Sequence, residues 1–196
     1  MDLRLAGDGT VVVCHDATLA RWGGGGMPIS RLSLERLRAR WPLPTLAEVL
    51  ELPCARDREL WLELKPHGGA AWTRRLVRAT CRLADAQRSR VRILCFAPAV
   101  LAQVAAGWPR LALVRNVERL GDAQAWWQAT AAAGITTVDA WHGAWTEGRV
   151  ALARAHGLAT AAWTVDRAPD LDRLRRLGID IVITNRPGWA CARLGA

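Results

Sequence analysis

The sequence predicts an α/β fold built on a parallel sheet, and three observations lead to this prediction. Short apolar stretches recur along the chain, amphipathic stretches with helical spacing separate them, and glycines stand where a helix would end and a strand begin. Hydrophobic residues make up 51% of the 196 residues, which is enough to build a core and excludes a disordered chain. No linker or internal repeat divides the sequence, so we expect residues 1–196 to form a single domain.

Seven stretches read as core strands, with a short extra one at residues 11–13. These core strands are residues 2–5, 60–64, 91–95, 111–114, 135–138, 159–163 and 180–183. The helical stretches are residues 44–52, 70–84, 98–106, 122–133, 145–155 and 168–177. Gly134, Gly157 and Gly178 each follow one of these helices, where glycine accepts the left-handed conformation that ends a helix.

Periodicity alone leaves the sheet architecture open between two parallel arrangements. A closed (β/α)₈ barrel needs eight parallel strands, whereas an open doubly wound sheet could use the same seven. An open sheet of that kind usually carries a glycine-rich phosphate loop between an early strand and a helix. The four glycines at residues 23–26 neither follow a strand nor lead into a helix, so they predict a flexible loop.

Charge and composition exclude several other classes of protein. The net charge of +9 invites a nucleic-acid interpretation, but the arginines alternate with leucine and acidic residues at helical spacing, which is typical of a solvated face. The five cysteines are widely spaced and predict neither a zinc site nor disulfides; we expect them to be small buried residues. The chain has no apolar run of about 20 residues and no secretory signal at its start, so we expect a cytoplasmic protein without a membrane span.

Lys65 is the one lysine among 27 basic residues, and it lies in the stretch Trp61-Leu62-Glu63-Leu64-Lys65. Its compact ammonium can occupy a site that the broad guanidinium of arginine cannot. Alternation places Glu63 and Lys65 on the same side of the strand, and a buried glutamate is costly unless it is paired or binds a metal. Two interpretations stay open: a structural Glu63–Lys65 ion pair, or a metal-binding carboxylate beside a phosphate-binding lysine. In the second case a further carboxylate is needed, and Asp2 on the first strand is well placed to provide it.

Two other positions at strand ends are candidates for a site. His15-Asp16 follows the apolar residues 11–13, and an imidazole beside a carboxylate can act as a general acid or base, although a turn histidine is an equal alternative. Trp163 ends the strand at residues 159–163 and either walls a substrate pocket or belongs to the core. The remaining histidines, His67, His142 and His156, have no partner that the sequence can identify, and we expect them to be non-catalytic.

Together these motifs resemble the glycerophosphodiester phosphodiesterases. The resemblance rests on Asp8-Gly9-x-Val11-Val12-x-x-His15-Asp16-x-x-Leu19-x-Arg21, on Pro44-Thr45-Leu46-x-Glu48-Val49-Leu50 and on Glu63-Leu64-Lys65. It continues through Cys95-Phe96, in place of the family's Ser-Phe, and through Trp163-Thr164-Val165-Asp166. It ends with Gly178-Ile179-Asp180-x-Val182-Ile183-Thr184-Asn185-Arg186-Pro187. The match runs almost from end to end and in the family's order.

The resemblance implies a (β/α)₈ barrel and a metal-dependent enzyme of the phosphoric diester hydrolase class. The family cleaves glycerophosphodiesters to glycerol 3-phosphate and an alcohol. Carried over by position, His15 would be one of two acid–base histidines, and Lys65 would act on the phosphate as a catalytic and substrate-binding residue. Asp2 and Glu63 would bind a divalent ion, either Mg²⁺ or Ca²⁺, and Trp163 would lie near the glycerol. Residues 18–42 would form the family's small insertion.

The resemblance also implies that this barrel lacks its first βα unit. The family begins with a strand ending in His-Arg-Gly, then a helix, then Glu-x-Asp on the second strand, and Asp2 corresponds to that Asp. One catalytic histidine, its arginine and one metal ligand therefore have no counterpart, and we expect the recorded chain to have impaired activity. A mis-set start accounts for this, and the alternative is a non-catalytic phosphoester-binding or interaction protein derived from the same barrel.

Overall fold

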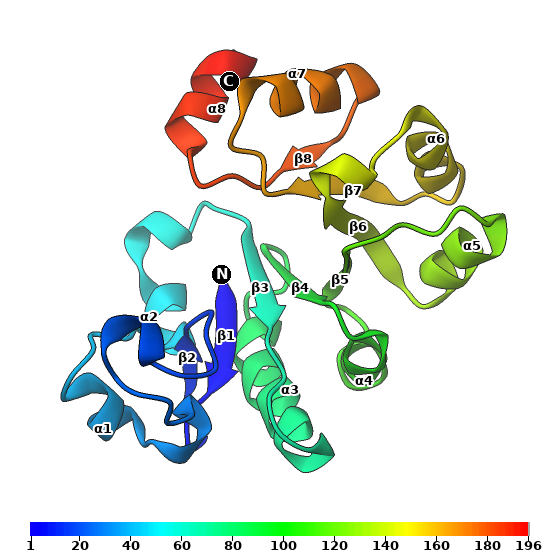
Figure 1. The fold of residues 1–196 in the computed structure, drawn as a ribbon. Helices are drawn as coiled ribbons and strands as arrows, with labels where there is room; N and C mark the ends of the chain where they lie inside the picture. The colour runs from blue at the N-terminus through cyan, green and yellow to red at the C-terminus, as the bar shows by residue number, and fades with distance from the viewer. Residues whose placement is uncertain (196) are drawn as a thin grey trace. The chain divides into compact units, whose positions relative to one another are not determined.

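The computed structural model describes residues 1–195 and forms two compact units, Met1–Ala112 and Leu113–Ala196. Both units have α/β architecture with predominantly parallel strands, as the sequence predicts (Figure 1). The single domain over residues 1–196 stays a prediction.

The first unit contains a four-stranded sheet in the order β2-β1-β3-β4. β1 (Asp2–Leu5) pairs antiparallel with β2 (Val11–Val13) and parallel with β3 (Leu60–Leu64), which in turn pairs parallel with β4 (Val91–Cys95). In Figure 1 the blue strand β1 lies between β2 and the cyan-green β3. β1, β3 and β4 begin and end where the sequence predicts them.

Buried and partly exposed side chains alternate strictly along β1 and β3, so the two faces of the sheet differ in character. Leu3 and Leu5 of β1 and Leu62 and Leu64 of β3 are buried on one face of the sheet. The intervening positions, including Asp2 and Glu63, face the other side, because successive side chains of a strand point to opposite faces.

Four α-helices accompany this sheet. They are α1 (Leu34–Arg38), α2 (Leu46–Glu51), α3 (Ala70–Asp85) and α4 (Pro98–Gly107). α2 begins at a capping box, in which the Thr45 hydroxyl accepts from the backbone N–H of Glu48 and the Glu48 carboxylate accepts from that of Thr45. α3 packs on β1 and β2 through one apolar side, which includes Leu76, Val77 and Cys81.

Residues 18–42 pack on a small apolar cluster beside β1 and β2. Thr18 bridges to Pro28, and the cluster combines Leu19, Ile29 and Leu37 of this segment with Val12 and Cys14. One glycine of the run takes part in this packing, because a Cβ at Gly24 would lie 2.5 Å from the Trp41 ring. A Cβ at any of the other three would meet nothing within 4 Å. Residues 23–26 lie in a loop, as expected from the sequence, and the flexibility of this loop stays a prediction.

The second unit contains strands in the order β5-β6-β7-β8, all parallel. β5 (Ala112–Val117) begins at the last residue of the first unit, and β6 (Ile135–Trp141), β7 (Ala159–Trp163) and β8 (Ile181–Val182) follow. β5 and β6 each run three residues beyond their predicted ends. β8 is two residues long, shorter than the predicted residues 180–183.

The helices of this unit are α5 (Gln124–Ala132), α6 (Glu147–Ala155), α7 (Ala168–Leu177) and α8 (Pro187–Leu194). Gly134, Gly157 and Gly178 have φ of 76°, 68° and 72°, so the prediction of left-handed residues after three helices is confirmed. α8 was not predicted, because Pro187 and Gly188 at its start are typical of a turn.

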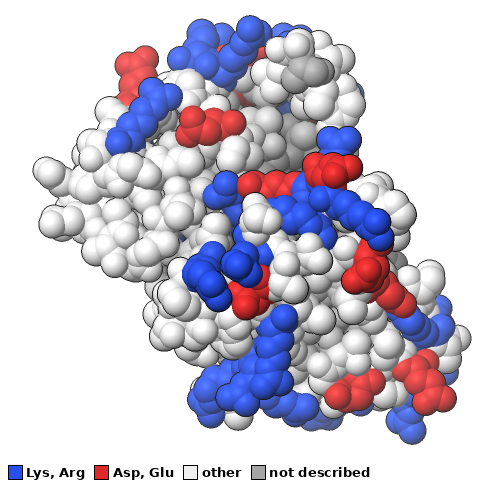
Figure 2. Space-filling model, turned by 180° about the vertical axis from the view of Figure 1, so that it is seen from behind, with Lys and Arg blue, Asp and Glu red and all other residues white. Residues whose placement is uncertain are grey.

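The surface charges occur in several separate groups, and acidic side chains accompany most of the basic ones on the face in Figure 2. Cys14, Cys81 and Cys95 are buried, as expected, but Cys54 and Cys191 are exposed, so the expectation of five buried cysteines is wrong for those two. Within residues 1–195 no helix is long and apolar enough to cross a membrane. The cytoplasmic location stays a prediction.

Candidate active site

Two carboxylates lie side by side on adjacent strands of the first unit. Asp2 and Glu63 are register partners in the parallel pair β1 and β3, and both face away from the leucine core. Their side chains are largely buried, with 30% and 14% of their surface exposed. The sequence-based expectation that Asp2 stands beside Glu63 therefore holds as geometry.

The ammonium of Lys65 lies against both carboxylates. Its Nζ is 2.5 Å from Oε1 of Glu63 and 3.4 Å from Oδ1 of Asp2, and it also lies 5.7 Å from the centre of the Phe96 ring. One positive charge thus shares two acidic partners in a site that excludes much of the surrounding water. Such a cluster fits both interpretations of the sequence, since the Glu63–Lys65 ion pair is present and the second carboxylate is in reach.

Burial raises the pKa of the Glu63 carboxyl above its usual value. The attraction of Lys65 lowers this pKa, and the neighbouring Asp2 carboxylate raises it further. Burial is the main cause of this raised pKa, and the ammonium of Lys65 offsets it only in part. The carboxylate pair supplies the oxygen ligands that hard divalent cations prefer.

His15 is oriented by a carboxylate of its own. Its Nδ1 lies 2.8 Å from Oδ1 of Asp16, and Oδ2 of Asp16 is 3.0 Å from Nε of Arg21. The hydrogen bond with His15 is the main cause that lowers the pKa of Asp16, which therefore stays ionised and accepts a hydrogen bond from the N–H at Nδ1. This arrangement leaves Nε2 as the exchangeable nitrogen, and the side chain of His15 is 61% exposed. A general acid or base needs both features.

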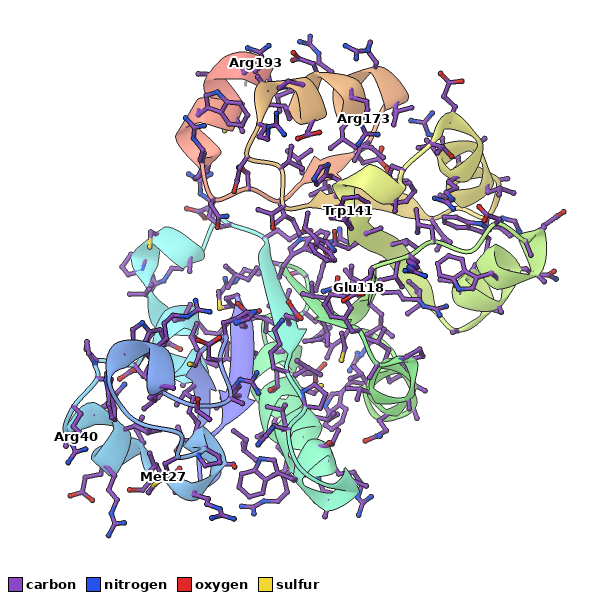
Figure 3. The ribbon with its side chains drawn as sticks, viewed as in Figure 1. Met27, Arg40, Glu118, Trp141, Arg173 and Arg193 are labelled. Atoms are coloured by element: carbon purple, nitrogen blue, oxygen red, sulfur yellow. The ribbon has the colours of Figure 1, made fainter. Side chains whose placement is uncertain are left out.

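Trp163 lies in the second unit, at the end of β7. It lines a pocket of about 600 Å³ together with Trp141, its register partner on β6, and with Glu118 and Arg119, which follow β5 (Figure 3). Trp163 thus lines a pocket, which favours the pocket-wall interpretation over plain core. Trp141 forms a second wall and is 48% exposed.

Cys95 stands where the resembling family has serine. Its buried Sγ donates to the carbonyl of Leu64 at 3.3 Å and accepts from the N–H of Ala97 at 3.4 Å. Burial raises the pKa of this thiol, so it stays protonated and serves as a packing and hydrogen-bonding group at the end of β4.

Two residues of these sites were missed from sequence. Trp141 was missed because the strand was expected to end at residue 138, before the acidic Asp139, whereas that carboxylate is buried and β6 continues. Arg4 was missed because one arginine among 26 carries no signal of its own. Its position two residues after Asp2, on the same face of the strand, was the available clue.

Comparisons with known proteins define first the class and then the family. An α/β fold with a carboxylate pair, a lysine and a histidine held by a carboxylate fits a hydrolase that acts on phosphate esters with the help of a metal ion. The chain belongs to the glycerophosphoryl diester phosphodiesterase family, whose sequence description matches residues 1–189. A search among curated proteins by sequence finds no match.

Solved structures share the fold over nearly the whole chain. A phosphodiesterase of Oleispira antarctica in complex with the product sn-glycerol-3-phosphate is 22% identical, with a TM-score of 0.85 over 100% of this chain and 83% of that one. Glycerophosphodiester phosphodiesterases of Parabacteroides distasonis and Thermotoga maritima are 19% and 23% identical, with TM-scores of 0.85 and 0.78. They align with 99% and 93% of this chain and with 82% and 79% of their own. The fold class predicted from the resemblance is confirmed.

Proposed function

We propose that this protein hydrolyses glycerophosphodiesters to glycerol 3-phosphate and an alcohol, with Asp2, Glu63, Lys65 and His15 as its working residues. The observation that carries the proposal is the Asp2–Glu63–Lys65 cluster, since a carboxylate pair sharing one cation is suited to a site that handles metal and phosphate together. Membership of the family and the glycerol 3-phosphate complex of the Oleispira antarctica protein support the substrate class.

A divalent cation fits the donors of this cluster as a partial site. The ammonium of Lys65 already touches both carboxylates, so one cation can reach Asp2 and Glu63 together. Within the described residues 1–195 no group of three or more His, Cys, Asp and Glu forms a fuller site. Mg²⁺ and Ca²⁺ both accept carboxylate oxygens and complete their shells with water and substrate oxygens. When bound, such an ion supplies charge neutralisation at the phosphate.

The chain's own groups perform the remaining tasks. Lys65 holds the phosphodiester monoanion and stabilises the negative charge that builds on its oxygens in the transition state. The phosphorus–oxygen bond to the alcohol breaks as an attacking hydroxyl forms a new one. His15, oriented through Nδ1 by Asp16, takes the proton of the attacking hydroxyl through Nε2 and returns it to the oxygen of the leaving alcohol, so the protons balance. That Trp163 lies near the glycerol stays an expectation from the resemblance, as does the assignment of residues 18–42 to the family's small insertion.

We expect turnover by this chain to be slow. The first unit offers two carboxylates for the ion and one histidine with an orienting carboxylate, whereas the family reaction uses two histidines. The contacts of Lys65 also favour a second candidate, a protein that binds phosphoesters without cleaving them. In that case the ammonium stays on Asp2 and Glu63, and no divalent ion displaces it.

Lys65 can be followed selectively, because it is the chain's one lysine. We would measure its acetylation by sulfo-NHS-acetate, identified by peptide mass spectrometry, with and without Mg²⁺ or Ca²⁺. For the metal-dependent enzyme, the ion takes over Asp2 and Glu63 and acetylation becomes faster; glycerol 3-phosphate added next protects Lys65. Glu63→Gln should abolish the effect of the ion.

The two candidate functions give different results in this experiment. Protection by glycerol 3-phosphate with no influence of either ion favours the phosphoester-binding protein. No protection under any condition contradicts both.

A further inference from the structure

Arg4 connects the two segments that carry the working residues of the first unit. It lies on β1, two residues after Asp2 and on the same face of the sheet. Its Nε donates to the carbonyl oxygen of His15 at 2.8 Å, and its Nη1 donates to that of Lys65 at 3.4 Å. We infer that Arg4 is a positioning residue, which sets the spacing between the His15 imidazole and the Lys65 ammonium.

The backbone around His15 and Lys65 explains why such a connection is needed. Both residues lie just beyond the ends of their strands, β2 and β3, on opposite sides of β1. The N–H of Lys65 donates to the carbonyl of Leu3 at 3.1 Å, so the hydrogen bonding between β1 and β3 still fixes the backbone of Lys65. For His15, Arg4 supplies a bond that the strand pairing of β1 and β2 does not, because that pairing ends at Val13.

The chemistry of arginine suits this position. The planar guanidinium carries donors in a fixed fork, so one side chain can hold two carbonyl groups at a set separation, whereas a lysine ammonium is a point donor on a flexible stem. Burial lowers the pKa of Arg4, yet a guanidinium stays protonated in proteins. Its charge faces the carboxylates of Asp2, Asp16 and Glu63, which are the acidic groups of the site.

This inference rests on the proposed function, since spacing matters only if His15 and Lys65 act on one phosphate. A misplacement of about 1 Å in such a pair can reduce turnover by about a hundredfold, while binding of the substrate changes little. The expected signature of a positioning role is therefore a fall in kcat with an almost unchanged KM. Residues that bind the phosphate directly would instead raise KM.

The test compares Arg4 with Arg90, a matched arginine of the same unit. Nη1 of Arg90 donates to the carbonyl of Ala55 at 2.6 Å and Nη2 to that of Leu50 at 3.1 Å, so it also ties two backbone carbonyls, but none that belongs to a working residue. The variants are Arg4→Ala, Arg4→Lys, Arg90→Ala and Arg90→Lys. Each is measured in the full chain for kcat and KM on glycerophosphocholine, for Tm, and for the acetylation rate of Lys65.

We expect both Arg4 variants to lose about ten- to a hundredfold in kcat with KM within about twofold. Free guanidinium should restore part of the kcat of Arg4→Ala, and the acetylation rate of Lys65 should change in both Arg4 variants. The Arg90 variants should lower Tm and leave kcat, KM and the acetylation rate as in the wild type. A kcat loss that simply follows Tm in both series, or an Arg4→Lys variant with wild-type kcat, would overturn the inference.

A failure of the proposed function is distinguishable from a failure of this inference. If the wild type releases no glycerol 3-phosphate, the proposed function fails. The positioning role is then decided by the acetylation rate of Lys65 and by the NMR signals of the His15 ring, identified by their loss in His15→Ala. Arg4→Ala with an unchanged acetylation rate and unchanged His15 signals would contradict the positioning role.

Discussion

Glu63 of the first unit and Asp166 of the second are both carboxylates near the carboxyl ends of strands, yet their surroundings differ completely. Asp166 accepts three hydrogen bonds of 2.8 Å, from the hydroxyl of Thr184 and from the backbone and side-chain amides of Asn185. The bonds from Asn185 are the main cause that lowers its pKa. Glu63 is buried beside a second carboxylate, shares one ammonium with it, and has a raised pKa.

This difference distinguishes a carboxylate that holds a loop in place from one that would bind a metal ion in the proposed function. Asp166 has its charge satisfied by donors of the β8–α8 connection, so it fastens a loop and has little capacity for a further cation. Glu63 is buried and shares the ammonium of Lys65 with Asp2, and under the proposed function a divalent cation would bind to both carboxylates. Both carboxylates lie near the carboxyl end of a strand. Their hydrogen-bond and ion-pair partners, and not their position along the chain, therefore distinguish the two roles.

The largest effect is expected from removing the histidine of the first unit. His15→Ala should lower kcat by about a hundred- to ten-thousandfold, because general acid–base catalysis contributes on that order. The matched variant is His156→Ala in the second unit, where Nδ1 lies 2.9 Å from the carbonyl of Leu152 within a helix end. An equal loss of kcat in both variants, measured in steady-state assays, would contradict the assignment of acid–base catalysis to His15.

Lys65 should show the next largest effect. Lys65→Ala removes a charged partner of the phosphate, which corresponds to about 1.5–3 kcal/mol or about a ten- to hundredfold loss in kcat/KM. Lys65→Arg should recover only part of it, because the guanidinium is broader than the ammonium. Arg193→Ala, which breaks a surface pair with Asp172, is the control and should leave kcat/KM unchanged.

Asp166→Asn should act on stability and not on turnover. The amide cannot accept the same set of bonds from Thr184 and Asn185, so Tm measured by calorimetry should fall. The kinetic constants at a temperature where the variant is folded should stay at wild-type values. A selective loss of kcat without a change in Tm would place Asp166 in the chemistry.

The smallest predicted effect concerns pH and the capping box of α2. The bond with Arg38 is the main cause that lowers the pKa of Glu48 from 4.5 to about 2. A depressed pKa contributes stability above the unfolded value, and this contribution is lost as the pH falls from about 4.5 through about 2. The stability difference between wild type and Glu48→Gln should therefore shrink over this range in urea titrations, and a constant difference would contradict it.

The bounds of strands and helices were predicted correctly where the apolar residues follow one spacing throughout, either that of a strand or that of a helix. β3, β4, β7 and α7 have the predicted bounds, because alternation or helical spacing runs unbroken to a turn signal. β6 was predicted too short because Asp139 interrupts the apolar pattern, although the folded strand buries it. No local pattern could report that burial.

The candidate site was predictable in part for the same reason. Alternation placed Glu63 and Lys65 on one face, and the position of Asp2 on the first strand made it the candidate for the second carboxylate. Other contacts depend on how the chain continues after β2. These are the hydrogen bonds from Arg4 to the carbonyls of His15 and Lys65 and the ion pair between Arg21 and Asp16. Such tertiary contacts leave no periodic trace in one sequence.

The most direct measurement of the central claim is release of glycerol 3-phosphate from glycerophosphocholine, with Mg²⁺ or Ca²⁺ and with EDTA, by the wild type, Glu63→Gln and Asp166→Asn. We predict slow release by the wild type and by Asp166→Asn, which EDTA abolishes, and none by Glu63→Gln. No release by the wild type, or equal release by Glu63→Gln or in EDTA, would contradict the assignment of the metal and phosphate site to Asp2, Glu63 and Lys65.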